Sequence, residues 1–290
     1  MVTPLQEYLF DLNGFIKLEN ALTIKEVNEL NQGLDEIPKI APNEWYGYLH
    51  REYCKDETRG TIYQQIYEAG KPFENLIDHP SWISHVKHFV GGEGTFDYHM
   101  GDLFIDENFA TIREYGEAIG IHSGGHEGTK RTQYRYHNGR FQCGQINILI
   151  ALTDSGPGDG GTMLIPGSHK ANFLHPEFAS RRMCTGASCD NITGAIEVFM
   201  KAGDALLFVD AISHGSAKRF NAGERRFIVF RYGPAWGNFR YGYKPSPELM
   251  ARLTPRQREI VYPFKELKRT PNRLIEEKSF ESNNRLVGIK

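Results

Sequence analysis

Between residues 95 and 232 the chain is a series of short apolar runs separated by glycine turns, and this pattern constrains the fold more than any other feature. Short strands that follow one another at such spacing are typical of a sandwich or a jelly roll rather than of a parallel sheet. The pattern therefore predicts an all-β core. The expected strands are Thr95–His99, Leu103–Asp106, Ala110–Glu114, Gly144–Ala151, Thr162–Pro166, Ile196–Phe199, Ala205–Phe208 and Arg226–Tyr232.

Helical signals precede and follow this β-rich segment. Thr23 can cap a helix that runs to about Leu34, with its apolar residues spaced for one buried face. A second helix is expected over Pro80–Val90. Near the C-terminal end, a capping residue stands directly before a proline in Ser246-Pro247 and Thr254-Pro255, which predicts two more helix starts.

The organisation of the chain indicates one domain. A chain of 290 residues with 40% hydrophobic residues can bury a full core, and no repeat, linker or low-complexity tract divides it. Phe10–Leu18 predicts a short strand entered by a turn at Asn13-Gly14. We predict a single domain over residues 1–290, with a helical N-terminal part to about 94, a jelly-roll core over about 95–235 and a helical C-terminal part over about 236–290.

Charge and composition limit the partners. The net charge of −2 provides no basic field for binding nucleic acid polymers. No run approaches the roughly 18 apolar residues of a membrane helix, and the first residues lack the regions of a signal peptide. The four cysteines are too scattered for a zinc site and are expected to be reduced thiols; they are Cys54, Cys143, Cys184 and Cys189. We expect a soluble, cytoplasmic protein that binds neither membranes nor nucleic acid polymers.

A candidate metal site lies in residues 121–127, Ile-His-Ser-Gly-Gly-His-Glu. Oxygen-activating iron sites commonly combine two imidazoles with one carboxylate in a facial triad. On a β-strand, a carboxylate two residues after the first histidine shares its face. For His122 that second position is Gly124, which has no side chain. The missing carboxylate is therefore the most informative feature of the segment.

The candidate set is completed by two residues in the second half of the chain, His214 and Arg225. His214 follows a predicted hydrophobic strand, where a second imidazole can reach the core. Arg225 directly precedes the predicted strand Arg226–Tyr232, and its guanidinium can bind a carboxylate through two parallel hydrogen bonds. A lone histidine at a strand end is most often a surface or satisfied core residue. The ordered set of His122, His214 and Arg225 within a β pattern is what indicates an active site.

These residues and their surroundings resemble the phytanoyl-CoA dioxygenase family of iron(II)/2-oxoglutarate-dependent enzymes. The similarity is strongest in residues 151–170, with the motifs Ala-Leu-Thr-Asp, Gly-Asp-Gly-Gly-Thr and Pro-Gly-Ser-His-Lys. It implies a double-stranded β-helix (a cupin-like jelly roll) with Fe(II), 2-oxoglutarate and O2 as cofactors. It also implies that His122 and His214 bind iron and that Arg225 pairs with the distal carboxylate of 2-oxoglutarate. Thr162 and Gln145 resemble further co-substrate contacts.

Gly124 departs from the family pattern, in which an aspartate completes the triad. The related halogenases have a small residue at this position, and a halide binds iron in the vacated place. Chloride can restore both the ligand and the negative charge that the missing carboxylate removes. The resemblance thus favours a halogenase of specialised metabolism, such as antibiotic biosynthesis, with Gly124 at the halide site.

Two other interpretations of Gly124 stay open. A carboxylate from elsewhere can complete the triad of a hydroxylase; the nearest in sequence are Glu127, Asp102 and Asp106. The chain can also be a ligand-binding relative that holds no metal. His126 is an alternative to His122, but it too lacks a carboxylate two residues later, and Glu127 directly after it would face the opposite way on a strand.

The substrate is suggested by the segment from Gly125 to Arg140. Its basic residues alternate with aromatic ones: Lys130, Arg131, Arg135 and Arg140 with Tyr134, Tyr136 and, next in the chain, Phe141. Such a segment can hold a phosphate and stack a base, although a solvated basic loop has the same composition. The candidate substrate contacts are His126, Lys130 and Arg131. A small molecule is expected, with phosphorylated nucleosides the first compounds to test and carrier-bound amino acids the other halogenase class.

Overall fold

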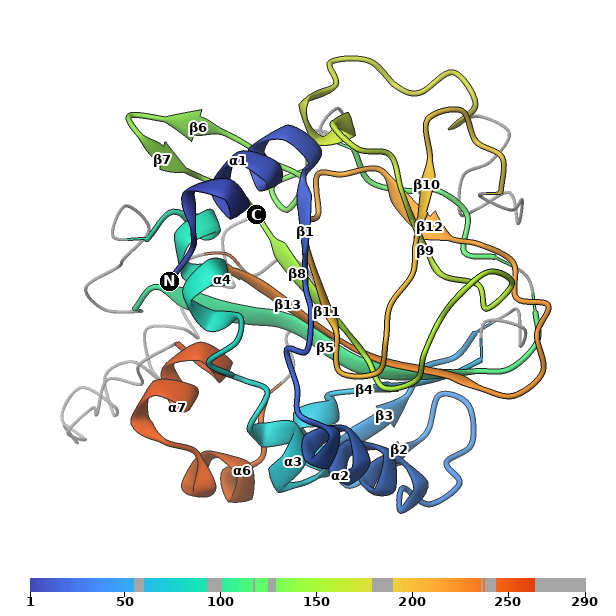
Figure 1. Ribbon diagram of the computed structural model, residues 1–290. Helices are drawn as coiled ribbons and strands as arrows, with labels where there is room; N and C mark the ends of the chain where they lie inside the picture. Colours follow the sequence, from blue (N-terminus) through green and yellow to red (C-terminus); the bar gives the residue numbers. More distant parts are fainter. Residues whose placement is uncertain are drawn as a thin grey trace, which may run out of the picture.

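The computed structural model describes residues 1–54, 60–92, 101–116, 118–124, 129–178, 190–235, 237 and 244–263 (Figure 1). An eight-stranded sheet and a three-stranded sheet, each antiparallel throughout, form its centre. In spatial order the large sheet contains β1 (Phe15–Leu18), β11 (Ala205–Val209), β8 (Ile146–Ala151), β13 (Arg225–Pro234), β5 (Leu103–Arg113), β4 (Thr61–Gln64), β3 (Leu49–Arg51) and β2 (Trp45–Tyr46). The small sheet contains β10 (Ile196–Val198), β9 (Thr162–Leu164) and β12 (His214–Ser216), and β6 (Tyr136–His137) pairs with β7 (Arg140–Phe141).

The two sheets form the jelly roll expected from the sequence. The small sheet faces one side of the large sheet, and helices cover the other side (Figure 1). A hydrogen bond from Arg225 on β13 to Thr162 on β9 joins the facing sheets. Because side chains alternate across a strand, one set of residues on β13 and β8 faces the helices while the other set faces the small sheet. The predicted all-β core with helical flanks is confirmed.

The strands differ from the predicted ones in several places, and β6, β7 and β12 were not predicted. A single eleven-residue strand, β5, covers the two segments predicted as Leu103–Asp106 and Ala110–Glu114. Its polar middle misled the prediction, because Glu107 and Asn108 are buried rather than exposed in a turn: Glu107 accepts a hydrogen bond from Gln64 of β4, and Asn108 accepts one from the backbone N–H of Tyr67. The predicted N-terminal part is less helical than expected, since it supplies β2 to β4 besides β1, which lies within the predicted strand Phe10–Leu18. The predicted strand Thr95–His99 lies outside the described residues.

The helix caps follow the predicted chemistry. In α2 (Ile24–Asp35) the Thr23 side chain accepts a hydrogen bond from the backbone N–H of Glu26. The Glu26 carboxylate in turn accepts one from the backbone N–H of Thr23. The C-terminal helices α6 (Pro247–Arg252) and α7 (Pro255–Val261) start after Ser246 and Thr254, as predicted. The remaining helical elements are α1 (Pro4–Asn13), η2 (Ile66–Ala69), α3 (Lys71–Glu74), α4 (Ile83–Val90) and η5 (Ser168–Lys170). In the described part of the chain, no helix has the length and apolarity needed to span a bilayer.

The N-terminal helix α1 was not predicted. Thr3 caps it through a reciprocal capping box with Gln6, so residues 10–13 are helical rather than part of a strand. Gly14 ends the helix at φ 84°, a left-handed conformation that glycine adopts without strain, and β1 follows at Phe15.

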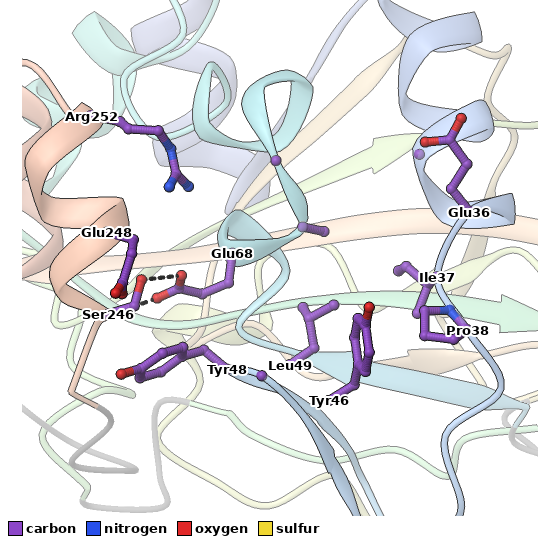
Figure 2. A pocket seen from close by; sticks show the side chains of 14 residues that line it. Glu36, Ile37, Pro38, Tyr46, Tyr48, Leu49, Glu68, Ser246, Glu248 and Arg252 are labelled. Atoms are coloured by element: carbon purple, nitrogen blue, oxygen red, sulfur yellow. Dashed lines mark hydrogen bonds between the residues drawn. The ribbon is translucent and has the colours of Figure 1, made fainter.

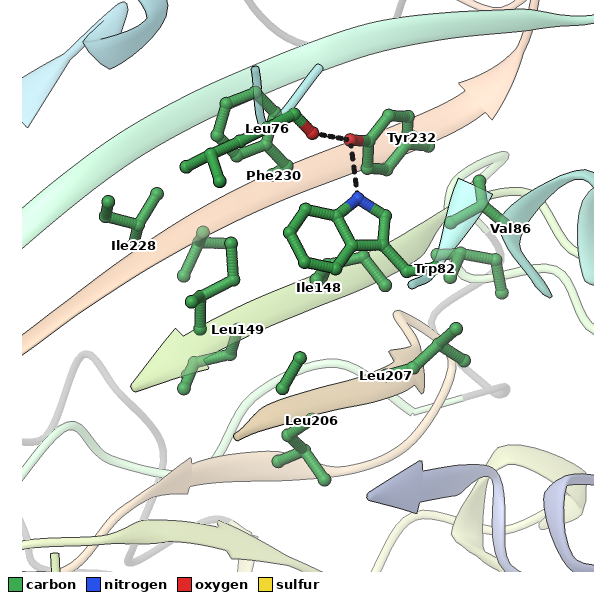
Figure 3. Close-up of a cluster of buried hydrophobic side chains, with 14 of the residues drawn as sticks. Leu76, Trp82, Val86, Ile148, Leu149, Leu206, Leu207, Ile228, Phe230 and Tyr232 are labelled. Atoms are coloured by element: carbon green, nitrogen blue, oxygen red, sulfur yellow. Dashed lines mark hydrogen bonds between the residues drawn. The ribbon is translucent and has the colours of Figure 1, made fainter. Parts of the chain in front are cut away.

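Trp82 anchors the helical layer on the outer face of the large sheet. Its side chain is fully buried, and its indole Nε1 donates to the hydroxyl of Tyr232 on β13 over 3.2 Å (Figure 3). Around this pair, Ile148, Phe230 and Val86 pack from two strands and from α4 (Figure 3). The contact therefore joins the helices to the central strands of the sheet.

Replacing Trp82 by Ala should lower the free energy of unfolding by about 3–5 kcal/mol, because it opens a cavity and leaves the Tyr232 hydroxyl without its indole donor. Trp45→Ala is the matched control, since Trp45 is half exposed at the sheet edge, and it should cost less than about 1 kcal/mol. Chemical denaturation of both variants provides the comparison. Equal losses in the two variants would contradict this assignment of the core.

Candidate active site

His122 and His214 come together beside the small sheet. Their backbones form an antiparallel bridge, with His122 N–H donating to His214 O over 2.9 Å and the reverse bond at 3.0 Å. Their imidazole ring centroids lie 4.1 Å apart. The two histidines chosen from the sequence are therefore neighbours in the fold.

The hydrogen bonds of the two imidazoles fix the same tautomer on both. His122 Nδ1 lies 3.1 Å from the carbonyl of Gly120, and His214 Nδ1 lies 2.8 Å from the carbonyl of Ile212. A carbonyl only accepts, so each Nδ1 carries the proton and each Nε2 keeps its lone pair. Burial lowers the pKa of His122, and the neighbouring His214 lowers it further. Both features suit neutral imidazoles that bind a metal through Nε2.

The chain leaves the strand geometry directly after His122. Ser123 has φ 58° and Gly124 has φ 120°, so the side-chain alternation expected from His122 to position 124 does not continue. Glycine tolerates the conformation at 124, whereas an L-residue with a side chain would be strained there. The backbone is thus a second reason, besides the missing side chain, why position 124 supplies no carboxylate.

No third metal ligand accompanies the two histidines within the described ranges, where no group of three His, Cys, Asp or Glu residues could hold an ion. Asp102, a candidate from the sequence, is paired with Lys87 and Arg256 instead. Asp106 accepts a hydrogen bond from Gln145. His126 and Glu127 lie outside the described residues, so their roles stay predictions.

Arg225 is the centre of a buried cationic cluster between the sheets. Its guanidinium donates to the carbonyl of Gly160 over 2.9 Å and to Thr162 Oγ1 over 3.2 Å. Burial and the neighbouring guanidiniums of Arg113 and Arg219 lower the pKa of Arg225 to about 9. An anion that enters would relieve this repulsion. The donors of Arg225 and Thr162 therefore suit a carboxylate such as that of 2-oxoglutarate.

Arg113 is a site residue that the sequence did not reveal. Its guanidinium donates to Ser216 Oγ over 3.1 Å and to the carbonyl of Gly116 over 3.1 Å. Ser216 Oγ also accepts the backbone N–H of Ile119 over 2.8 Å. Ser216 stands two residues after His214 and Ile119 three residues before His122, so Arg113 connects the two histidine segments. Ser216 is distant from Arg113 in sequence, and no local motif marks this contact.

The other predicted contacts are spread over the interior and the surface. Gln145 is fully buried, and its Nε2 donates to Asp106 over 2.9 Å, which leaves an acceptor oxygen that suits a co-substrate carboxylate poorly. Arg131 Nε donates to the buried carboxylate of Asp210 over 3.0 Å, whereas Lys130 is exposed. Contacts of these residues with co-substrate or substrate stay predictions.

The aromatic residues of the predicted base-stacking segment are largely used for packing. Tyr134 and Phe141 lie against Phe10 of α1, and Phe141 also packs edge-on against Phe89 of α4. Tyr136 is half exposed at the hairpin and contacts Phe141. Tyr134 and Phe141 are therefore not free to stack a base.

The two cysteines that the structure describes, Cys54 and Cys143, form no disulfide. Cys143 is a buried free thiol, and burial raises the pKa of its thiol well above the usual range. Cys184 and Cys189 lie outside the described residues.

A surface pocket between α2, β3, η2 and α6 is separate from the histidine pair (Figure 2). Glu68 in this pocket accepts hydrogen bonds from the backbone and hydroxyl of Ser246, at the start of α6. Arg252, also at its edge, pairs with the buried Glu74. These charged groups attach α6 to the core, and none of the proposed metal or co-substrate residues lines the pocket.

Comparison with known proteins identifies the family and the fold. The sequence profile of the phytanoyl-CoA dioxygenase (PhyH) family matches residues 10–227. Dioxygenase cdmD of Talaromyces verruculosus is 26% identical over 237 residues, which cover 80% of this chain and 68% of that protein. HygX of Streptomyces hygroscopicus, solved with nickel and 2-oxoglutarate, superposes with a TM-score of 0.67 at 24% identity, covering 86% of this chain and 94% of that one. The epimerase SnoN from nogalamycin biosynthesis has a TM-score of 0.53 at 14% identity, covering 83% and 90%.

The chain belongs to the phytanoyl-CoA dioxygenase family, because the family profile covers most of its length. It is accordingly an iron- and 2-oxoglutarate-dependent oxygenase by family, and the solved structures share its jelly-roll fold.

Arg225→Ala should weaken 2-oxoglutarate binding by about 2–5 kcal/mol, because it removes the buried guanidinium that we expect to pair with the distal carboxylate. Arg226→Ala is the matched control: Arg226 faces the opposite side of β13, where it pairs with Asp35 and Glu224. Anaerobic titration of the metal-loaded protein with 2-oxoglutarate measures both affinities. A wild-type affinity in Arg225→Ala would refute the assignment.

Proposed function

We propose that the protein is an iron(II)- and 2-oxoglutarate-dependent halogenase that chlorinates an unactivated carbon of a small molecule. Gly124 is the observation that carries the proposal. It stands where hydroxylases of this family carry an aspartate, and its φ of 120° disfavours any residue with a side chain. One coordination position at iron is then left for an external anion, and chloride has the required charge.

In this proposal His122 and His214 bind iron(II) through Nε2, and Arg225 with Thr162 holds the distal carboxylate of 2-oxoglutarate. Bound iron, 2-oxoglutarate and O2 together supply an oxidant that removes hydrogen from an unactivated carbon. The protein's part is positioning: the carbonyls of Gly120 and Ile212 orient the imidazoles, and Arg113 holds the two histidine segments together. Burial of the cluster excludes water from the charged contacts.

The overall chlorination is balanced without a further reductant. Substrate R–H, chloride, 2-oxoglutarate, O2 and one proton give R–Cl, succinate, CO2 and water. One oxygen atom of O2 enters succinate and the other leaves as water. The oxidation of 2-oxoglutarate and that of the carbon together provide the four electrons that reduce O2.

A hydroxylase is the second candidate, and Glu127 is the residue that favours it. This carboxylate lies five positions after His122 in sequence and can take the coordination position that Gly124 leaves open. The similarity to a dioxygenase and to HygX, which was also solved with hygromycin B bound, supports oxidation of a small molecule in either case.

His122→Ala and His214→Ala should each abolish tight iron(II) binding, because either change removes one of two neutral imidazole ligands. His137→Ala is the matched control, since His137 is exposed on the β6–β7 hairpin. Metal content after anaerobic loading and desalting is the measurement. Full iron binding by the His122 variant would shift the ligand assignment to His126.

Product formed in chloride should carry chlorine, and chloride should tighten binding of 2-oxoglutarate to the iron-loaded protein. Gly124→Asp should abolish chlorination, and strain at φ 120° should lower the free energy of unfolding by about 1–3 kcal/mol. Mass spectrometry of products made with and without chloride distinguishes chlorination from hydroxylation. A product that gains only oxygen at saturating chloride would refute the halogenase proposal and favour the hydroxylase.

A further inference from the structure

The carbonyl that orients His214 belongs to a short turn, which side chains from distant parts of the chain hold at both ends. The turn consists of residues 210–213, between β11 and β12, and Ile212 N–H closes it by donating to the carbonyl of Val209 over 3.0 Å. The Ile212 carbonyl lies 2.8 Å from Nδ1 of His214. The orientation of this imidazole therefore depends on where the turn places Ile212.

Asp210 anchors the first end of the turn. Its side chain is 1% exposed, and both carboxylate oxygens accept hydrogen bonds: Oδ2 from Arg131 Nε over 3.0 Å and Oδ1 from Asn147 Nδ2 over 3.1 Å. Arg231 adds a longer ion pair at 3.9 Å. Burying a carboxylate is unfavourable unless partners such as these satisfy its charge and its oxygens. Asp210 is thus fixed in place chiefly by Arg131 and Asn147.

Ser213 anchors the second end of the turn. Its backbone N–H donates to Ser168 Oγ over 2.8 Å, and its carbonyl accepts from the N–H of Ile165 over 3.0 Å. The Ser168 hydroxyl itself donates to the carbonyl of Ile165 over 2.6 Å, so its oxygen is left as an acceptor for Ser213. Because Ser213 directly precedes His214, these bonds also set where β12 begins.

The backbone around Arg131 is held against the start of β8. Gly144 N–H donates to the carbonyl of Gln133 over 2.8 Å. A Cβ at Gly144 would lie 2.0 Å from the carbonyl oxygen of Lys130, so the two segments approach this closely only because residue 144 is glycine. Arg131 therefore reaches the turn from a fixed position.

The ion pair with Asp210 changes the interpretation of Arg131. The sequence suggested this residue as a substrate contact because it is basic and follows His122 in the same segment. Its side chain is only 27% exposed, and the buried carboxylate of Asp210 offsets its charge. A guanidinium used in this way places the turn rather than attracting an anionic substrate.

We propose that Arg131 and Ser168 are positioning residues for His214. Arg131 acts through Asp210 and Ser168 acts through Ser213, and both hold the turn whose carbonyl orients the imidazole. This inference rests on the proposed function, in which His214 binds iron(II). The outer partners of metal-binding histidines typically change metal affinity by about 10–100-fold, so the two residues should influence iron(II) binding without touching the ion.

Arg131→Met should weaken iron(II) binding about tenfold, at the lower end of the effect of outer partners. Arg252→Met is the matched control, because Arg252 on α6 pairs in the same way with the fully buried Glu74. Both variants should be less stable to chemical denaturant, but only Arg131→Met should lose iron(II) affinity. Anaerobic titration against a competing chelator measures the affinities.

A double-mutant cycle tests whether Arg131 acts through Asp210. Asp210→Asn keeps the size of the side chain but offers one acceptor oxygen to two donors, so it should also weaken iron(II) binding about tenfold. In the combined variant that oxygen can still accept from Asn147, so the affinity should fall no further than in either single variant. Losses that multiply would show that Arg131 does not act through Asp210.

Ser168→Ala examines the other end of the turn and should weaken iron(II) binding about three- to tenfold, because it removes the acceptor of Ser213 N–H. Ser168→Thr keeps the hydroxyl and should restore the affinity. Ser81→Ala is the matched control: the Ser81 hydroxyl donates to the carbonyl of Ala21 over 2.7 Å, and its loss should leave iron(II) binding unchanged.

Amide hydrogen exchange of the metal-free protein separates this inference from the proposed function. The Ile212 and Ser213 amides should exchange at least about tenfold faster in Arg131→Met than in the wild type, and Arg252→Met should not change them. If the wild type binds no iron(II), the proposed function fails, and the exchange rates still decide whether Arg131 holds the turn.

Three results would overturn the inference. They are wild-type iron(II) affinity in both Arg131→Met and Ser168→Ala, an equal loss of affinity in Arg252→Met, and unchanged exchange of the turn amides in Arg131→Met. The first result would leave Arg131 as a candidate substrate contact only.

Discussion

The backbone bridge between His122 and His214 is the contact on which the candidate active site depends. Two hydrogen bonds hold these residues in register, and the carbonyls of Gly120 and Ile212 then orient both rings. A metal site needs ligands fixed before the ion arrives, because orienting them afterwards would reduce its affinity. Arg113 secures the bridge from the large sheet through Ser216, so the large sheet also positions the histidines.

The interior of the jelly roll is polar where the chemistry is expected and apolar elsewhere. Arg225 is buried near the guanidiniums of Arg113 and Arg219, which lower its pKa, and a bound anion would relieve this repulsion. The buried amide oxygens of Gln64, Gln145 and Asn147 are polar in the opposite sense, since they are acceptors with no donor among the residues that the structure describes. The outer face of the same sheet is instead filled by the apolar cluster around Trp82. Stability and function are thus divided between the two faces of one sheet.

Local features of the sequence predicted much of this arrangement. The caps at Thr23, Ser246 and Thr254 depend on residues three positions apart, and the structure contains all three. The strands were recognised wherever apolar runs were continuous, but β5 was divided in two because Glu107 is buried against partners on β4 and β13. Long-range pairing of polar residues leaves no periodic trace in the sequence.

The residues of the candidate site were likewise predictable where local motifs mark them. His122, His214 and Arg225 follow from motif and order, whereas Arg113 and Asp210 acquire meaning only from contacts with residues far away in the chain.

The conformation of Gly124 changes the meaning of the missing carboxylate. From sequence, glycine there is only the absence of a side chain, and a single substitution to aspartate would restore the triad on a regular strand. The left-handed φ values of Ser123 and Gly124 instead turn the chain away after His122. A carboxylate at 124 would then reach the metal only at the cost of backbone strain. The backbone itself, and not one residue type, therefore separates this site from a facial triad built on a strand.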